Sequence, residues 1–268
     1  MTNVIALYNI KGGVGKTSAA VNLAWTAADE GARVLLWDLD PQGAASYLLR
    51  IRPKVRGGGA KLVRGKSDPT ALLKGSDHPR LDLLPADFSY RNMDLALDAT
   101  KRPTEGLDRV LAPIAGDYDY VFLDCAPAIS LASESVFFAA DVLLVPLIPT
   151  PLSLHTYDQL RGFVADEVAK PRPRILAFLS MIDGRKALHR SVAGDLAADD
   201  GVLHSTIPAA SDVERMGSQR RALAQFAPHR RAALAYGALW TELRGRLADG
   251  PTRSRRARGS GRSRRGPA

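Results

Sequence analysis

A glycine-rich segment near the N-terminus carries residues whose types and spacing suit phosphate chemistry. It reads Lys11-Gly12-Gly13-Val14-Gly15-Lys16-Thr17-Ser18 and lies between an apolar run at 4–9 and a helix-like segment at 16–30. Glycines let successive backbone N–H groups approach phosphate oxygens closely, and a helix N-terminus adds partial positive charge. We therefore predict that every residue of this segment binds a nucleotide, that Lys16 reaches its β- and γ-phosphates, and that the Thr17 hydroxyl coordinates Mg²⁺.

Acidic residues follow two other apolar runs. Asp38 and Asp40 stand at the end of the run at 33–39, and Asp124 ends the run at 120–124. Ligands of a parallel sheet collect at the carboxyl ends of its strands, so we expect these carboxylates beside the glycine-rich loop. Asp40 is predicted to orient an attacking water and to contact the metal, with Asp38 supporting it. Asp124 is predicted to hold a water on Mg²⁺, which keeps several waters when bound.

The elements that must position these groups alternate along the chain. Apolar runs separated by helix-compatible segments recur at 4–9, 33–39, 81–84, 120–124, 142–148, 175–182 and 202–207. This alternation predicts an α/β fold with a mostly parallel twisted sheet and helices on both faces. Together with the glycine-rich loop, it predicts a single P-loop NTPase domain. We place the domain at 1–250, with a last helix at 230–247, and expect a disordered arginine-rich tail at 251–268.

The glycine-rich loop departs from the usual phosphate-loop pattern. That pattern has a glycine where this sequence has Ile10, and a lysine, Lys11, opens the loop instead. A loop with two lysines resembles the deviant Walker A motif of the ParA/MinD family of ATPases. The segments 38–43 and 118–124 look like the second motif and the Walker B strand of that family. The Leu-Leu-Pro-Ala run at 83–86 looks closer to the ParA, Soj-like members than to MinD.

The resemblance implies a switch that is driven by ATP. In such ATPases the lysine at the position of Lys11 reaches the nucleotide of a second copy, so that a homodimer sandwiches ATP and Mg²⁺. Lys11, Lys16 and Asp40 would then act in hydrolysis, which dissolves the dimer. ParA-like proteins bind nonspecific DNA in the ATP state and release it when a ParB-like or cargo-linked activating protein stimulates hydrolysis. The expected role is partitioning of a chromosome, a plasmid or another cargo, in the cytoplasm and on the nucleoid.

Basic residues point to an acidic partner, but they are concentrated in two stretches. The chain carries 37 Lys and Arg against 28 Asp and Glu, a net charge of +9. Seven arginines and no acid lie from 253 onward, and eight cations with one acid lie at 50–74, so the remainder has 22 basic and 27 acidic residues. We expect 50–75 to be an exposed basic insertion loop.

Arginines are the expected contacts to DNA, because neutralising phosphates releases counterions and gives sequence-independent affinity. Arg185 resembles a DNA-contacting position of ParA relatives, and further basic residues follow it in the body and in the tail. The complete predicted set is Arg185, Arg215, Arg220, Arg221, Arg253, Arg255, Arg256 and Arg258.

Two other interpretations compete with DNA partitioning. A MinD-like membrane switch would use an amphipathic helix, and Tyr236, Trp240, Leu243 and Leu247 form a helical stripe, although such spacing more often packs on the sheet. A metabolic ATPase of the same fold would need a substrate pocket that the residue pattern does not reveal. The single cysteine, Cys125, excludes an internal disulfide and a cysteine cluster within one chain. No apolar run approaches the ~18 residues that span a bilayer, so we expect no membrane-spanning segment and a cytoplasmic protein. Because the stripe is expected to pack on the sheet, a membrane is not expected as a partner.

Overall fold

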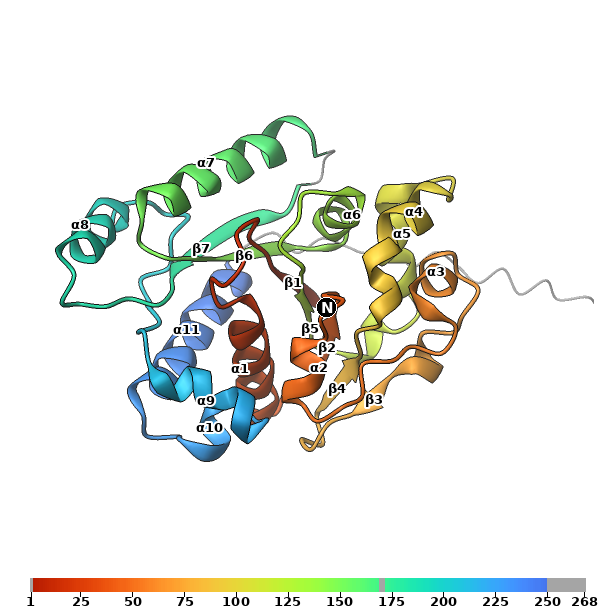
Figure 1. Ribbon diagram of the computed structural model, residues 1–268, viewed down its shortest axis with the longest axis horizontal. Helices are drawn as coiled ribbons and strands as arrows, with labels where there is room; N and C mark the ends of the chain where they lie inside the picture. Colours follow the sequence, from red (N-terminus) through yellow and green to blue (C-terminus); the bar gives the residue numbers. More distant parts are fainter. Residues whose placement is uncertain (1, 169–171, 250–268) are drawn as a thin grey trace, which may run out of the picture.

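One sheet runs through the centre of the protein. The computed structural model describes residues 2–168 and 172–249. Within these residues the strands form a seven-stranded sheet of order β3-β4-β2-β5-β1-β6-β7 (Figure 1). The strands are β1 (Asn3–Leu7), β2 (Val34–Asp38), β3 (Lys74–Gly75), β4 (Leu81–Leu84), β5 (Tyr120–Asp124), β6 (Val142–Leu147) and β7 (Arg174–Leu179). Each strand pairs in parallel with its neighbours except β3, which is antiparallel to β4. The predicted α/β sheet is therefore confirmed.

Helices cover both faces of this sheet (Figure 1). One face is covered by α1 (Lys16–Asp29), α2 (Ala44–Leu48), α9 (Ser211–Gln219), α10 (Leu223–Phe226) and α11 (Arg231–Ala248). The other face is covered by α3 (Gly58–Val63), α4 (Met93–Asp98), α5 (Gly106–Leu111), α6 (Leu131–Ala139) and α7 (Pro151–Asp166), with α8 (Ala187–Leu196) at the β7 end. Both layers are needed because the strands are apolar on both sides.

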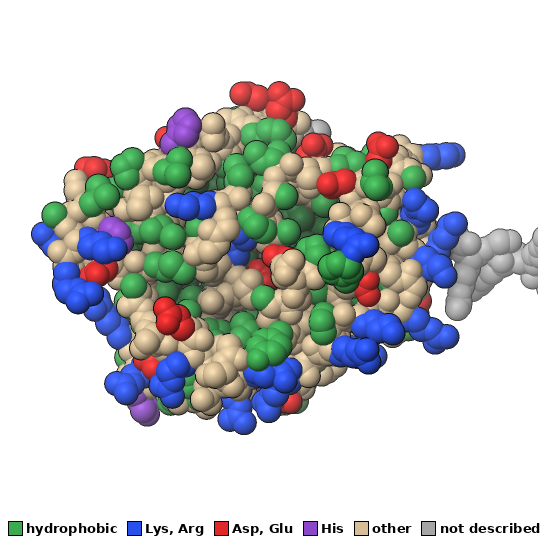
Figure 2. Space-filling model, in the orientation of Figure 1, with side chains coloured by type: hydrophobic (Ala, Val, Ile, Leu, Met, Phe, Trp, Pro, Cys, Tyr) green, Lys and Arg blue, Asp and Glu red, His purple; other side chains and the backbone are tan. Residues whose placement is uncertain are grey.

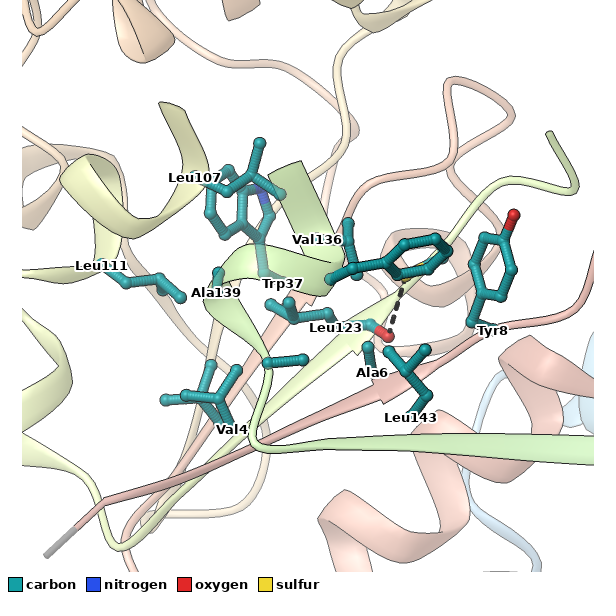
Figure 3. Packing of buried hydrophobic residues seen from close by; sticks show 14 of the residues in the cluster. Val4, Ala6, Tyr8, Trp37, Leu107, Leu111, Leu123, Val136, Ala139 and Leu143 are labelled. Atoms are coloured by element: carbon teal, nitrogen blue, oxygen red, sulfur yellow. Dashed lines mark hydrogen bonds between the residues drawn. The ribbon is translucent and has the colours of Figure 1, made fainter. Parts of the chain in front are cut away.

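Strand β1 contributes alternate side chains to the hydrophobic clusters on the two faces of the sheet. Val4 and Ala6 point into one hydrophobic cluster, whereas Ile5 and Leu7 point into the other, and all four are fully buried. Successive side chains of a strand face opposite sides, so a continuous apolar run is what a doubly covered strand requires. Figure 3 shows one cluster, where side chains of four strands meet those of α5 and α6: Val4, Ala6, Tyr8, Trp37, Leu123, Leu143, Leu107, Leu111, Val136 and Ala139.

The basic stretch at 50–75 is not the exposed loop that the sequence predicted. It contains α3, a 3₁₀ turn at Thr70–Leu72 and the two-residue edge strand β3. Its apolar side chains Val55, Leu62, Val63 and Leu72 are buried in a hydrophobic cluster. The cations dominate the composition, but the interleaved apolar residues decide the structure, because burying them offsets the cost of ordering the backbone.

A second correction concerns 202–207, which was predicted as a strand. It contacts β7 through the isolated bridge Ala177–Val202 with its two backbone hydrogen bonds, and again where the N–H of Ile207 donates to the carbonyl oxygen of Leu179 at 2.8 Å, without forming a continuous ladder. The amides of His204 and Ser205 instead donate to the carboxylate of Glu242 on α11, both at 2.8 Å. This carboxylate takes the donors that a continued strand would have used.

The predicted last helix is confirmed as α11, and its apolar stripe faces the sheet. Tyr236, Trp240, Leu243 and Leu247 are all at most 8% exposed. They pack in the cluster formed by α1 and the strands, so the stripe serves the core. Among the described residues no helix has the length and apolarity to cross a membrane. The predicted tail at 251–268 lies outside the described residues.

Candidate nucleotide-binding site

The glycine-rich loop joins β1 to α1 at the carboxyl edge of the sheet, as predicted. Gly15 precedes the helix with φ of 93°, and a Cβ added there would lie 3.1 Å from the Ser180 hydroxyl oxygen. Both the backbone and the space therefore require glycine at this position. No side chain caps the N-terminus of α1, and its first turn contains no acid. The free amides and the helix dipole at this point suit an anionic group.

Lys16 folds back over the loop from the first turn of α1. Its Nζ donates to the carbonyl oxygens of Asn9 at 3.1 Å and Lys11 at 3.0 Å. Burial lowers the pKa of Lys16, and the negative charges of Asp124 and Asp40 partly oppose this effect. Neutral carbonyl oxygens are weaker partners for an ammonium than charged phosphate oxygens, so these contacts can be exchanged for a nucleotide.

Asn9 anchors the loop, a role that the sequence analysis missed. Its side-chain amide donates to the carbonyl of Pro146 on β6 at 2.8 Å, and its Oδ1 accepts from the backbone N–H of Lys11 at 2.9 Å. Asn9 is 3% exposed, whereas the side chain of Lys11 is only half-buried at the loop's edge. The sequence signal that could have identified Asn9 is a polar amide at the end of the apolar run at 4–9, just ahead of the glycine-rich loop.

The strand order determines which carboxylate lies nearest the loop. The sequence analysis placed the end of the second strand beside the loop, but β5 lies between β1 and β2. In register, Asp124 pairs with Leu7 on β1 and with Asp38 on β2. Asp124 therefore takes the central position, and Asp38 and Asp40 lie one strand further away.

Asp38 and Asp124 form a buried acidic pair with unused oxygens. Both are fully buried, and among the described residues neither oxygen of Asp124 nor Oδ1 of Asp38 has a hydrogen-bond partner of good geometry. Burial raises the pKa of Asp38 to about 6, against hydrogen bonds from Ser46. Burial also raises the pKa of Asp124 well above its usual value, with Asp38 adding to it and the nearby Thr17 hydroxyl opposing it. Such a pair requires a proton or a bound cation.

Asp40 occupies a tight turn between β2 and α2. Its Oδ1 accepts from the backbone N–H of Gln42 at 2.9 Å, and its side chain is half-exposed at the same edge of the sheet. Hydrogen bonds between the strand before this turn and the helix after it hold the turn in place: Ser46 donates its N–H and its hydroxyl to Asp38 Oδ2, each at 2.7 Å. The Ser46 hydroxyl also accepts from the N–H of Ala86 at 3.0 Å. Asp38 thus holds the first turn of the helix that follows Asp40.

The donor set fits a magnesium nucleotide. Among the described residues, no cluster of three or more His, Cys, Asp and Glu could hold a metal by itself. Mg²⁺ is usually bound through one or two carboxylates, waters and substrate phosphates, and so does not need such a cluster. The unpartnered oxygens of Asp124, the Thr17 hydroxyl and the uncapped helix end supply what that arrangement uses. The adjoining thiol of Cys125 is buried, and burial and Asp124 raise its pKa, so it is a packing residue.

The predicted DNA-contacting arginines are held in different ways. The guanidinium of Arg185 donates twice to the carboxylate of Asp183, both at 2.9 Å, and the one of Arg215 donates to Asp212 at 3.1 Å. Arg221 is exposed, and within the described part of the chain it makes no ion pair. Two of these arginines are thus partly neutralised by an acid of the same protein.

Arg220 is bound to α2 rather than presented freely. Its Nε donates to the carbonyl oxygen of Tyr47 at 2.9 Å, and its guanidinium lies 4.5 Å from the centre of the Tyr47 ring. It ends α9 in the left-handed region, with φ of 48°. The remaining predicted contacts, Arg253, Arg255, Arg256 and Arg258, lie outside the described residues.

Comparisons with known proteins identify the family of this chain. The AAA domain family matches residues 2–174. The chromosome partitioning protein ParA of Caulobacter vibrioides is 34% identical over 213 residues, which cover 76% of this chain and 80% of that protein. The chromosome-partitioning ATPase Soj of Thermus thermophilus is 35% identical over 259 residues, covering 91% of this chain and 96% of Soj.

A solved structure gives the same result at the level of the fold. Cobyrinic acid a,c-diamide synthase from Mycobacterium smegmatis, with bound ADP and magnesium, superposes with a TM-score of 0.78 at 27% identity. The match covers 94% of this chain and 97% of the synthase. The loop, the strand order and these relatives agree, and the chain belongs to the AAA domain family and, within it, to the ParA/MinD group of P-loop ATPases.

Proposed function

We propose that this protein is a magnesium-dependent, dimerising ATPase of the ParA type that binds nonspecific DNA in its ATP state. The observation that carries the proposal is the buried pair Asp38 and Asp124, whose unused oxygens lie beside an uncapped helix N-terminus under Lys16. Buried carboxylates without partners are costly, and a divalent cation with a nucleotide resolves that cost.

Each residue of the site has a distinct task in this proposal. Amides of the loop 11–18 bind phosphate oxygens, and Lys16 leaves its carbonyl partners to neutralise the β- and γ-phosphates. Thr17 and Asp124 would hold Mg²⁺, and the metal would neutralise the charge that develops on the phosphates. Asp40 orients the attacking water. Phosphoryl transfer needs positioning and charge stabilisation more than covalent chemistry, so one such carboxylate suffices.

Lys11 provides the link between hydrolysis and assembly. Its backbone is fixed by Asn9, while its side chain lies half-buried in the glycine-rich loop and so keeps part of its surface open to a second copy. In the proposed homodimer the two Lys11 side chains contact the nucleotide of the opposite protomer, so hydrolysis releases the protomers. A ParB-like or cargo-linked protein would trigger this step. The names of the ParA and Soj relatives support a role in chromosome partitioning, and we place this role on the nucleoid as part of the proposal.

The alternative functions have less support. A MinD-like membrane switch would need a free amphipathic stripe, but the stripe of α11 is buried against the sheet. A metabolic ATPase would need a substrate pocket beside the nucleotide. A cavity of about 200 Å³ does adjoin Cys125 and Leu39, but its walls are mostly apolar. It is small for a ligand site, since such pockets usually enclose about 300–1,000 Å³.

Substituting Asp40→Ala tests the catalytic assignment. We expect the variant to bind ATP, to lose at least about 100-fold in hydrolysis, and to elute as a dimer with ATP in size-exclusion chromatography with light scattering. Asp82→Ala, on β4 away from the loop, is the control. Hydrolysis by Asp40→Ala at the wild-type rate would show that another group positions the water.

Sedimentation separates DNA partitioning from membrane association. The full chain is mixed with nonspecific DNA or with anionic liposomes, each with ATP and with ADP. We expect it to pellet more strongly with DNA in ATP than in ADP, and not with liposomes. Removing the residues from Arg253 onward should flatten the salt dependence of DNA binding. Pelleting with liposomes instead would favour the MinD-like alternative.

A further inference from the structure

Arg220 is directed at a neighbouring helix rather than at solvent. Lys and Arg side chains lie along the lower edge of the face shown in Figure 2, around α2, α9 and α10. Arg220 is half-buried, and among the described residues it makes no ion pair within 4.0 Å. Its contacts go to Tyr47 of α2 instead, through Nε and through the face of the ring. Two such contacts fix the guanidinium more firmly than water and salt fix an exposed cation.

The backbone of Arg220 has a conformation that glycine would adopt more easily. Its φ of 48° lies in the left-handed region, which a residue with a Cβ rarely occupies. Residues keep such a conformation where the surroundings over-determine it, and these positions cluster at functional sites. The N–H of Arg220 donates to the carbonyl oxygen of Met216 at 2.7 Å and closes α9. The side chain leaves the helix at this point and reaches α2.

Asn22 of α1 fixes the segment that carries Arg220. The helices α9 and α10 lie beside α1 (Figure 1). Asn22 is 2% exposed, its Nδ2 donates to Sδ of Met216 at 3.3 Å, and its Oδ1 accepts from the N–H of Leu223 at 2.8 Å. Nδ2 also donates to the carbonyl oxygen of Ser18 at 2.8 Å, in the first turn of α1. Arg220 therefore lies between two points that are held by the helix of the phosphate loop.

A short series of hydrogen bonds leads from Arg220 to the turn at 40–43, which we call the Asp40 turn. Nε of Arg220 donates to the carbonyl oxygen of Tyr47 at 2.9 Å. The N–H of Tyr47 donates to the carbonyl of Gly43, and the N–H of Gly43 donates to that of Asp40, both at 2.9 Å. The helix α2 has only five residues, so a contact at its end acts on the turn at its start. The cation is also favourable at the C-terminal end of a helix.

We propose that Arg220 is a positioning residue for ATP hydrolysis, which holds the Asp40 turn in place relative to the phosphate loop. The inference deepens the proposed function and rests on it, because Asp40 orients water only if the protein hydrolyses ATP. The loop and α1 bind the nucleotide, whereas the Asp40 turn follows the last residue of β2 and needs support of its own. A misplaced carboxylate slows the chemical step without weakening nucleotide binding. Arg220 thus has a role other than the DNA contact that the sequence predicted.

The substitution Arg220→Gly tests this role, because it removes the contact to α2 without straining the backbone. Glycine adopts a φ of 48° freely, so α9 should still end at the same place. Arg220→Lys keeps the charge but loses the planar guanidinium. Arg80→Ala removes an exposed arginine just before β4 and is the control of equal charge change. Phosphate release from ATP and Mg²⁺ is measured on the full chain without DNA, and urea unfolding reports the folded fraction.

The proposal predicts a loss of kcat with little change in KM. Arg220→Gly should lower kcat about tenfold and change KM for ATP less than twofold, since Lys16 and the loop amides are unchanged. Arg220→Lys should have a kcat between those of Arg220→Gly and the wild type, and Arg80→Ala should match the wild type. A wild-type kcat in Arg220→Gly would overturn the proposal. So would an equal loss in Arg80→Ala, or a loss that only follows the fraction of unfolded protein.

Hydrogen exchange of the nucleotide-free protein separates this inference from the proposed function. Amides of the segment 40–48 should exchange about fivefold faster in Arg220→Gly than in the wild type, whereas those of β5 should not change. This measurement does not depend on hydrolysis. A wild type that releases no phosphate would contradict the ATPase proposal, while faster exchange at 40–48 would still support the contact between Arg220 and the Asp40 turn. Unchanged exchange at 40–48 would overturn the inference whatever the rate of hydrolysis.

Discussion

Charged side chains have opposite environments in the nucleotide site and in the basic stretch at 50–75. At the nucleotide site, Asp38, Asp124 and Lys16 are at most 7% exposed, and Lys16 and Asp38 are held by a few specific hydrogen bonds. In the basic stretch at 50–75, Arg52, Lys54 and Arg56 are exposed on an ordered backbone and make no ion pair within 4.0 Å among the described residues.

The difference determines how much a single residue can contribute. Removing a buried charge has a large effect, because interactions in a low-dielectric site are strong and few other groups can replace it. An exposed cation is screened by water and salt, so it contributes a modest, additive share of affinity. We therefore expect single substitutions to decide the function of the nucleotide site and only to adjust binding at the surface.

The largest effect is expected from Lys16→Ala. The loop would lose the ammonium that neutralises the phosphates, and hydrolysis should fall at least about 100-fold in a phosphate-release assay. The matched lysine is Lys11. Lys11→Ala should retain nucleotide binding by a fluorescent ATP analogue but lose the ATP-dependent dimer. If both lysines gave the same phenotype, the division of roles between them would be wrong.

A smaller effect is expected on stability from Asp38→Asn in the nucleotide-free protein. The pKa of Asp38 is raised by burial from 3.8 to about 6, so the folded state binds more protons than the unfolded state between these values. The free energy of unfolding should then fall as pH rises from about 4 to about 6, and stay low above that range.

The variant removes this penalty. Asp38→Asn should be more stable than wild type at pH 7, by on the order of 2 kcal/mol, and should flatten the pH dependence. Urea unfolding at pH 4.5 and pH 7 measures both. Asp77→Asn, an exposed acid paired with Arg50, is the control and should change stability by less than about 1 kcal/mol. An unchanged pH dependence in Asp38→Asn would assign the effect to Asp124.

The smallest effect is expected from Asp212→Asn on α9. This substitution removes the acid that pairs with Arg215 and frees the guanidinium for phosphates. DNA affinity with ATP should rise about two- to threefold, with a slightly steeper salt dependence in anisotropy titrations. Asp166→Asn at the end of α7 is the control of equal charge change. Equal gains in both would mean that net charge alone, and no release of Arg215, sets the affinity.

Local patterns predicted most of the fold. The apolar runs at 81–84 and 120–124 coincide with β4 and β5, and the helices that start at Lys16 and Arg231 were expected within a residue of their ends. The phosphate loop was recognised because its glycines, lysines and position between strand and helix are all local in sequence. The predictions failed where distant residues compete, as at 202–207, where Glu242 takes the backbone donors of the expected strand.

The sequence by itself determined that this protein has a phosphate-binding loop with a second lysine, two acidic strand ends and a doubly covered sheet. These features depend on residue types and short spacings. Only the tertiary structure decided that Asp124 lies between the loop and Asp38, that Asn9 ties the loop to β6, and that two predicted arginines face acids. It also decided that the basic stretch at 50–75 is an ordered segment with a helix and an edge strand, because burial of its apolar side chains depends on elements far away in the chain.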